Sequence, residues 1–226
     1  MNNFLLKPLT NLFNLIHSGV TSLIGTGNLS LAYFFDIFIF TALIKLILLP
    51  LTIKQTRSTV MMSKIQPEMK KLQEKYKNDP QTLQQKQMAL YKEMGVNPLA
   101  GCLPLLVQMP VFIAMYWVIY GYSGFNDVGF LWMKSLGEPD KTFVLPILSG
   151  LTTYLSGVMM SPKGDDPSAK TQKQMNIFMS VFFIYMSYKF KAALVLYWII
   201  SNLIQVLIQY FIINKIKHKE EAKLAE

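Results

Sequence analysis

The chain has 226 residues, of which 52% are hydrophobic and 13% aromatic, and its 22 basic and 13 acidic residues give a formal net charge of +9 at pH 7. Such an apolar composition excludes an ordinary soluble domain. The charged residues are gathered into a few segments. We therefore predict an all-α protein that crosses a membrane several times.

Residues 1–30 are predicted to lie at the outer surface of the membrane. Residues 3–18 have the apolar periodicity of an amphipathic helix that rests on a bilayer. Its apolar face consists of Leu5, Leu9, Leu12 and Ile16. A secretory signal peptide is the competing interpretation, but a positively charged start and a small-residue cleavage site are missing. Residues 18–30 are interpreted as a connector into the first span.

Five segments are apolar and close to the ~20 residues that a helix needs to cross a bilayer core. They are residues 31–53, 98–121, 142–160, 174–188 and 192–213, of which the fourth is short. Basic residues are concentrated in the intervening segments 54–97 and 161–173 and in the tail 214–226. By the positive-inside rule these three segments are cytoplasmic, whereas the N-terminus and the loop 122–141 lie outside.

The segment 54–97 is predicted to form a cytoplasmic hairpin of two helices, with a turn at Asn78, Asp79 and Pro80. The apolar seam between its helices is thin, so the hairpin should be mobile. The seam residues are Ile65, Met69, Leu72, Tyr76, Leu83, Leu90 and Met94. Its methionines provide either an adaptable surface for partners or mere packing.

Lys45 is the one basic residue inside the five predicted spans. A lysine at the centre of a spanning helix costs about 2.5–3.5 kcal/mol on translocon scales, so it should face water or polar side chains. The alternative is that Lys45 snorkels to the interface. However, the nine residues to Lys54 span roughly 13 Å at ~1.5 Å per residue, about twice the reach of a lysine. Asp36 lies on the opposite face and is expected near the outer interface.

Polar residues gather on one helical face in four of the spans, whereas a random distribution would scatter them. The faces comprise Thr41, Lys45 and Thr52; Ser149, Thr152, Thr153 and Ser156; Asn176, Ser180 and Ser187; and Trp198, Asn202, Gln205 and Gln209. Gln108 lies in the remaining span, which three prolines loosen or kink. Together these residues predict a hydrophilic groove around Lys45. The alternative is that the hydroxyls and amides hydrogen-bond the helices to one another.

Several classes of chemistry are not supported by the sequence. No carboxylate accompanies Lys45 at depth, which disfavours a proton relay, and no pair of nucleophile and base indicates an enzyme. His17 and His218 lie near opposite ends of the chain, and Cys102 is the one cysteine, so neither a metal site nor a disulfide is expected. We therefore predict no cofactor.

Three strings resemble the signature of the YidC/Oxa/Alb membrane-protein insertases. They are GVNPLAGCLPLLVQMPVFIAMY at Gly95–Tyr116, ALIKLILLPLTIKQT at Ala42–Thr56 and LVLYWIISN at Leu194–Asn202. The resemblance implies five helices around a groove that is open to the cytoplasm and lipid and closed to the outside. It also implies that the protein inserts and folds other membrane proteins in a bacterial cell membrane, alone or beside the Sec translocon.

Residue by residue, the resemblance places Lys45 where bacterial members usually have arginine, and Trp198 in the aromatic pair of the last span. Lys189, Lys191 and Ala192 depart from the Pro and Gly common before that span. The chain lacks the large outer domain of Gram-negative members, a lipoprotein cysteine and a long basic tail. It therefore resembles a compact bacterial form.

The implied partners are nascent membrane proteins, the ribosome and the Sec translocon, and the basic cytoplasmic face would also attract anionic lipids. No binding to DNA is expected. In the resulting hypothesis, groove water and Lys45 receive the acidic residues of a substrate part-way across, while its apolar segments enter lipid. The alternatives are a small-solute or anion transporter that binds its cargo at Lys45, and a purely structural assembly chaperone.

Overall fold

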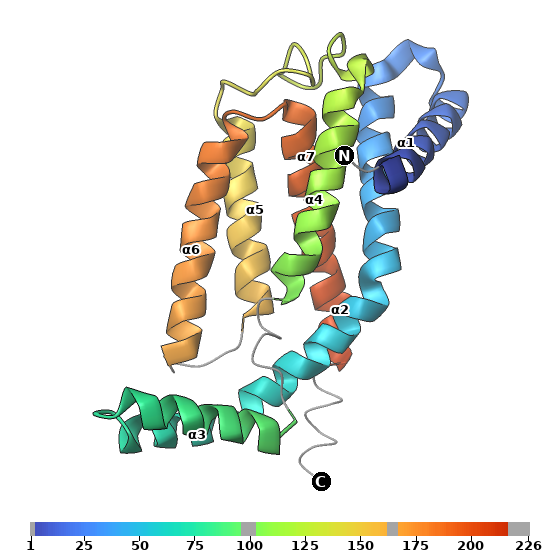
Figure 1. Cartoon of the computed structure of the whole chain (residues 1–226). Coiled ribbons are helices and arrows are strands. Elements are labelled where there is room, and N and C mark those ends of the chain that lie inside the picture. The colour runs from blue at the N-terminus through green and yellow to red at the C-terminus, as the bar shows by residue number, and fades with distance from the viewer. Residues whose placement is uncertain (1–2, 96–102, 162–166, 217–226) are drawn as a thin grey trace.

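The computed structural model describes residues 3–95, 103–161 and 167–216, and apart from one isolated β-bridge its regular elements are helices (Figure 1). The predicted all-α class is therefore confirmed for these residues. The helices are α1 (Asn3–Ile24), α2 (Leu29–Lys75), α3 (Pro80–Glu93), α4 (Leu103–Gly121), α5 (Val144–Met160), α6 (Pro167–Ser187) and α7 (Ala192–Ile208), which continues as the π-helical turn η4 (Gln209–Ile213). The short 3-10 helices are η1 (Thr26–Asn28) and η3 (Ser123–Phe125).

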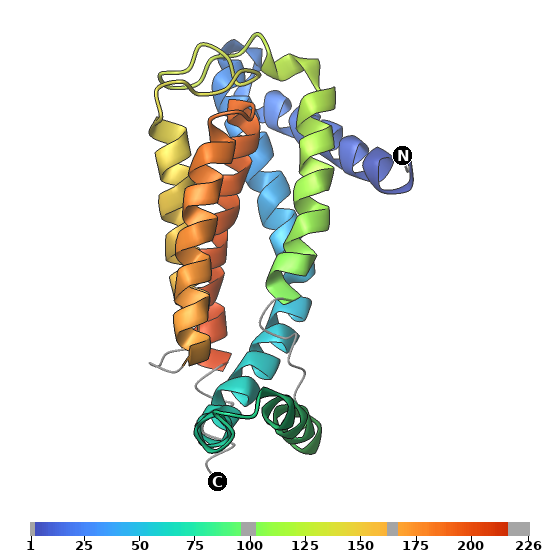
Figure 2. The same ribbon diagram turned by 60° about the vertical axis from the view of Figure 1, so that its left-hand side comes forward.

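The long helices run side by side as a bundle, with α1 lying obliquely against one end and α3 folding back beyond the other (Figures 1 and 2). Among the described residues, two helical segments are long and apolar enough to cross a membrane, Leu29–Gln55 and Ala192–Ile216. Val107–Gly121 and Val144–Met160 are shorter apolar helices. The regions of four of the five predicted spans are thus apolar helices in the structure.

The first predicted span and the first helix of the predicted hairpin form one continuous helix, α2, where the sequence indicated a boundary at residue 53. Pro50 and Pro67 lie inside it. A proline removes one backbone donor and bends a helix without necessarily ending it. Accordingly, α2 bends away from the bundle in its second half (Figure 1). The predicted surface helix is also longer than expected, because α1 continues to Ile24.

A turn lies between α2 and α3, just before Asp79 and Pro80. Asp79 precedes α3, its side chain accepts a hydrogen bond from the Thr82 N–H, and Pro80 occupies the first turn. Gly95 follows the helix with φ 62°, the left-handed conformation that commonly ends a helix. Ile65 is buried, but none of the α3 side chains is. The hairpin seam is therefore thin, as the sequence indicated.

The hydrophobic core lies in the half of the bundle next to the loop between α4 and α5. It is built from α1, the first turns of α2 and α7, the last turns of α4, and that loop. Its largest fully buried side chains include Phe13, Phe40, Ile119, Phe125 and Tyr197. The nine residues Ala192–Ile200 of α7 are all buried, so α7 is the central helix. This end of the bundle is filled by apolar side chains.

The loop between α4 and α5 is tied to the bundle by hydrogen bonds. The backbone N–H groups of Ala192 and Ala193 donate to Glu138 O and Leu136 O, which joins the loop to the start of α7. The buried carboxylate of Asp140 accepts from the N–H groups of Thr142 (2.9 Å) and Leu145 (2.8 Å). Burial alone would raise the pKa of Asp140, but these hydrogen bonds hold it below its usual value. The loop is therefore an ordered lid over the bundle end.

Helices α5 and α6 approach closely at Gly150, which is buried in their interface. A methyl group there would clash with Ile184 Cγ1 and lie 3.1 Å from Ser180 O. We expect Gly150→Ala to destabilise the fold by about 1–3 kcal/mol, the usual effect of overpacking. The measurement is the midpoint of thermal unfolding in detergent. Gly19→Ala is the matched control, because a methyl there meets nothing within 4 Å and should stabilise helix α1 slightly. Equal midpoints for the two variants would contradict the close approach.

Candidate functional site

Lys45 lies in α2 and reaches across to two other helices. Its Nζ donates to Gln108 Oε1 of α4 (3.3 Å) and to Gln205 Oε1 of α7 (3.1 Å). Gln108 Nε2 in turn donates to the hydroxyl of Tyr197 on α7 (3.2 Å). These four residues, which we call the lysine–glutamine cluster, bring together α2, α4 and α7 at the edge of the apolar core.

The lysine–glutamine cluster solvates a cation without neutralising it. An ammonium group has three N–H donors, and neutral amide oxygens accept two of them here. No carboxylate within the described ranges forms an ion pair with Lys45. Gln205 Nε2 is buried without a hydrogen-bond partner. The cluster therefore holds the amine with amide oxygens and leaves the Gln205 amide N–H groups without an acceptor.

A second polar cluster joins α5 to α7. Thr153 Oγ1 accepts from Trp198 Nε1 (2.8 Å) and from Asn202 Nδ2 (3.0 Å), and Asn202 also approaches Thr152 Oγ1 at 3.4 Å. The Trp198 ring stacks on Phe183 of α6, with ring centroids 3.9 Å apart. Because Asn202 and Gln205 are three residues apart on α7, this threonine cluster is next to the lysine–glutamine cluster on the same helix.

Thr153 holds two donors, so its hydroxyl should matter more than that of its neighbour. We expect Thr153→Val to lower the free energy of unfolding by about 1–3 kcal/mol, because the donors of Trp198 and Asn202 both lose their acceptor. Thr152→Val serves as the control and should have a smaller effect, because Thr152 accepts one long hydrogen bond from α7 and, like Thr153, otherwise donates to carbonyls of α5. Thermal unfolding in detergent, followed by tryptophan fluorescence, measures both. A larger loss for Thr152→Val would contradict this assignment.

The remaining predicted groove residues bond within or between neighbouring helices. Ser149 Oγ is 2.8 Å from Ser187 Oγ, and Asn176 Nδ2 donates to Ser161 Oγ (2.9 Å), so both pairs link α5 to α6. Ser180 and Thr41 donate to carbonyls of their own helices, as does Thr52. Ser156 approaches Met160 Sδ, and Gln209 Nε2 donates to Asn214 Oδ1. These contacts have the form of the hydrogen-bonded alternative described above.

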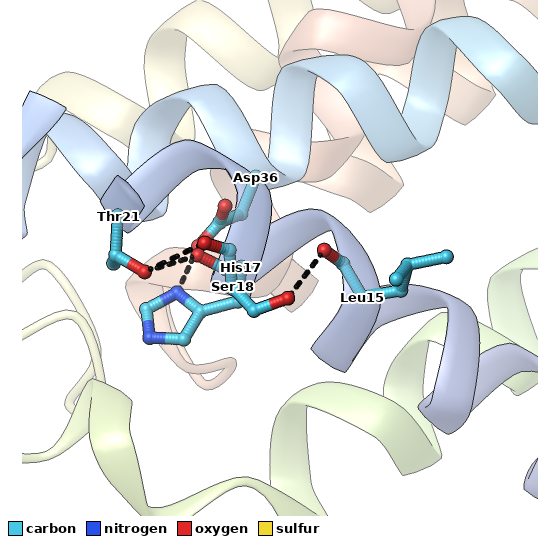
Figure 3. A network of polar contacts seen from close by, with 5 residues as sticks. All are labelled: Leu15, His17, Ser18, Thr21 and Asp36. Atoms are coloured by element: carbon cyan, nitrogen blue, oxygen red, sulfur yellow. Dashed lines mark hydrogen bonds and ion pairs between the residues drawn. The ribbon is translucent and has the colours of Figure 1, made fainter. Parts of the chain in front are cut away.

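A buried acidic residue and a histidine, which the sequence did not bring together, form a hydrogen-bonded pair between α1 and α2 (Figure 3). His17 Nδ1 of α1 lies 2.6 Å from Asp36 Oδ2 of α2, and Asp36 is fully buried. The His17 ring stacks on Tyr33 at 4.8 Å. A histidine on the inner face of an amphipathic helix and a lone acid in a span were the available signals. Their separation of 19 positions along the chain concealed the pairing.

Within residues 3–95, 103–161 and 167–216, no group of three or more histidine, cysteine or acidic side chains is arranged to hold a metal ion. His218 and Cys102 lie outside the described residues.

The sequence is similar to proteins of a known family. Residues 25–220 match the family described as 60Kd inner membrane protein. A Clostridium tetani protein named membrane protein insertase YidC is 49% identical over 216 residues, which cover 96% of each chain. The chain belongs to the YidC family. A second YidC, from Clostridium perfringens, is 48% identical and is covered over 98% of its length. YidC of Francisella philomiragia is 42% identical, but the match covers only 34% of it.

A solved structure shares this fold. It is described as an active YidC insertase crystal structure with the first transmembrane domain resolved, and it superposes with a TM-score of 0.69 at 29% identity. The match covers 93% of the present chain and 47% of the solved one, so this chain spans about half of that YidC. Membership of the YidC family, together with the two long apolar helices, identifies a bacterial membrane protein.

Proposed function

We propose that this YidC-family chain is a membrane protein insertase, which integrates and folds nascent membrane proteins through a hydrophilic groove that contains Lys45. The observation that carries the proposal is the lysine–glutamine cluster, in which a charged amine is held by neutral amide oxygens alone. The insertase names of its close relatives support the activity itself.

The groove would run from the lysine–glutamine cluster to the threonine cluster along α7. Asn202, Gln205 and Thr153 provide donors and acceptors that can replace water around a passing polypeptide backbone. Lys45 would attract carboxylates of the substrate's outer segment, while its apolar segments enter lipid alongside. The apolar core and the ordered loop at the other end support a groove that is closed on that side.

The proposed topology has five membrane crossings, made by the first half of α2 and by α4, α5, α6 and α7. The N-terminus and the loop between α4 and α5 would be outside, and the hairpin of α2 and α3 would be cytoplasmic. The basic residues on the cytoplasmic segments support this orientation. The hairpin, whose α3 has no buried side chain, is the proposed contact for the ribosome, the Sec translocon or emerging chains, and its lysines for anionic lipids.

Reconstitution of the full chain into vesicles tests the proposed function. A single-span client with a short acidic outer segment should acquire a protease-protected fragment in the absence of ATP and of the Sec translocon. Empty vesicles, and vesicles with an unrelated membrane protein, are the controls. Efflux of a labelled small anion without any protection of the client would contradict the insertase and favour the transporter that the sequence left open.

A further inference from the structure

The loop between α4 and α5 contains a tight turn with an unusual composition. Phe130 and Met133 exchange both of their backbone hydrogen bonds, at 3.0 and 2.9 Å, so Leu131 and Trp132 are the two central residues of a hairpin turn. Turns of this kind need a positive φ at the first central position and favour glycine or asparagine there. Leu131 nevertheless occupies it, with φ 53°.

The side chains at the tip of this turn are exposed to different degrees. Leu131 is 74% exposed and Trp132 is 42% exposed. Burial of the Leu131 side chain therefore does not offset the strain of its backbone. Backbone strain persists where the surrounding structure holds it, and it concentrates at functional positions. Small polar residues would satisfy the turn better. We therefore infer that Leu131 and Trp132 contact an apolar surface outside the chain.

The turn is held rigidly against the first turns of α2. The Phe130 ring stacks on Phe34, with centroids 5.4 Å apart, and the Ser30 hydroxyl donates to Gly129 O. Met133 is buried behind the tip. The Trp132 side chain hydrogen-bonds to the carboxylate of Asp140, which satisfies its indole N–H within the protein. The turn thus presents Leu131 and the Trp132 ring in a fixed position.

The apolar surface continues from the turn onto α2. Leu29, Leu31 and Phe35 lie in the first two turns of α2 and are 36–39% exposed. Because α2 is long and apolar enough to cross the membrane, its exposed apolar side chains at this end adjoin the bilayer. The contacts of Phe130 and Ser30 with this part of α2 place the tip beside the same lipid-facing surface.

We propose that Leu131 and Trp132 form a lipid anchor, which enters the interfacial region of the outer leaflet and fixes the depth of the loop. Tryptophan is enriched at the membrane–water interface, and the Trp132 side chain is partly exposed while its N–H is satisfied by Asp140. The anchor goes beyond the proposed insertase activity. Since the same loop accepts hydrogen bonds from the first N–H groups of α7, it would also set the depth at which α7 begins.

Fluorescence quenching in vesicles tests the anchor on the full chain. A Leu131→Cys variant in a Cys102→Ser background is labelled with an environment-sensitive fluorophore and reconstituted into phosphatidylcholine and phosphatidylglycerol. We expect a lipid with a spin label near its headgroup to quench the label at least twice as strongly as aqueous iodide does. Lys141→Cys, an exposed position of the same loop, is the matched control and should show the reverse. Quenching of Leu131→Cys chiefly by iodide, or by neither agent, would overturn the anchor.

A second measurement avoids the label. The emission of Trp132 is isolated as the difference between the native chain and Trp132→Phe, and it should be quenched by lipids brominated near the headgroup. Thermal unfolding in detergent shows whether Trp132→Phe remains folded. A difference spectrum that brominated lipids leave unchanged would contradict the proposal even if the labelled variant fails to fold.

Discussion

Replacing Lys45 with methionine is expected to lower the integration of an acidic client at least tenfold. Methionine keeps much of the length of the side chain and removes its charge. A unit charge pair at 4 Å interacts by about 4 kcal/mol at an effective dielectric constant of 20, and a loss of about 1.4 kcal/mol is already tenfold. The protease-protected fraction of the client in reconstituted vesicles measures the effect.

Three comparisons make this result specific to the charge in the lysine–glutamine cluster. Lys45→Arg should retain most of the integration, because the charge persists although the donor geometry changes. Lys54→Met removes an exposed lysine nine residues further along α2 and should have little effect. A client without acidic residues in its outer segment should depend less on Lys45. Unchanged integration of the acidic client by Lys45→Met would contradict the proposed mechanism.

Replacing His17 with alanine is expected to produce the largest loss of stability among the variants considered. It would leave the fully buried side chain of Asp36 without its hydrogen-bond partner, and an unsatisfied buried polar group typically costs about 1–3 kcal/mol, or more when it is charged. The pair is the polar link between α1 and α2 at this point (Figure 3). The loss should appear as a lower midpoint of thermal unfolding in detergent.

A double variant separates the contribution of the His17–Asp36 hydrogen bond to stability from that of the packing around it. His17→Phe combined with Asp36→Leu removes both polar groups and should recover most of the stability, because an apolar replacement of a buried pair is often neutral. Thr21→Ala is the control, because Thr21 lies on the same face of α1 as His17 but its hydroxyl donates only to carbonyls of α1. If His17→Ala were as stable as Thr21→Ala, the pair would not be holding α1 in place.

The sequence predicted the helices better than it predicted their boundaries. Apolar length located α4, α5 and α7, but the continuation of α2 through Pro50 was missed, because a proline that would end a short helix only bends a long one. The turn before α3 was readable from Asn78, Asp79 and Pro80, because these signals are local. Boundaries set by tertiary packing have no such local signal.

The candidate site was predictable in part for the same reason. Helical phase grouped Trp198, Asn202 and Gln205 on one face of the last span, and a lone charge in an apolar span singled out Lys45. Phase does not say which helix a face meets. Consequently, Ser149 and Asn176 carried the same polar signal as Thr153 but pair between α5 and α6. The bond from Gln108 to Tyr197, and the pairing of His17 with Asp36, depend on distances that only the fold provides.

The most direct test of the account is the water accessibility of the proposed groove. Single cysteines replace Lys45, Thr153 and Gln205 in a Cys102→Ser background, and a membrane-impermeant maleimide is applied to each side of reconstituted vesicles in turn. The account predicts modification from the cytoplasmic side at all three positions, and none from the outer side. Phe40→Cys, in the apolar core, is the unreactive control. Three cysteines that resist the reagent from both sides, in folded protein, would contradict a wet groove around Lys45.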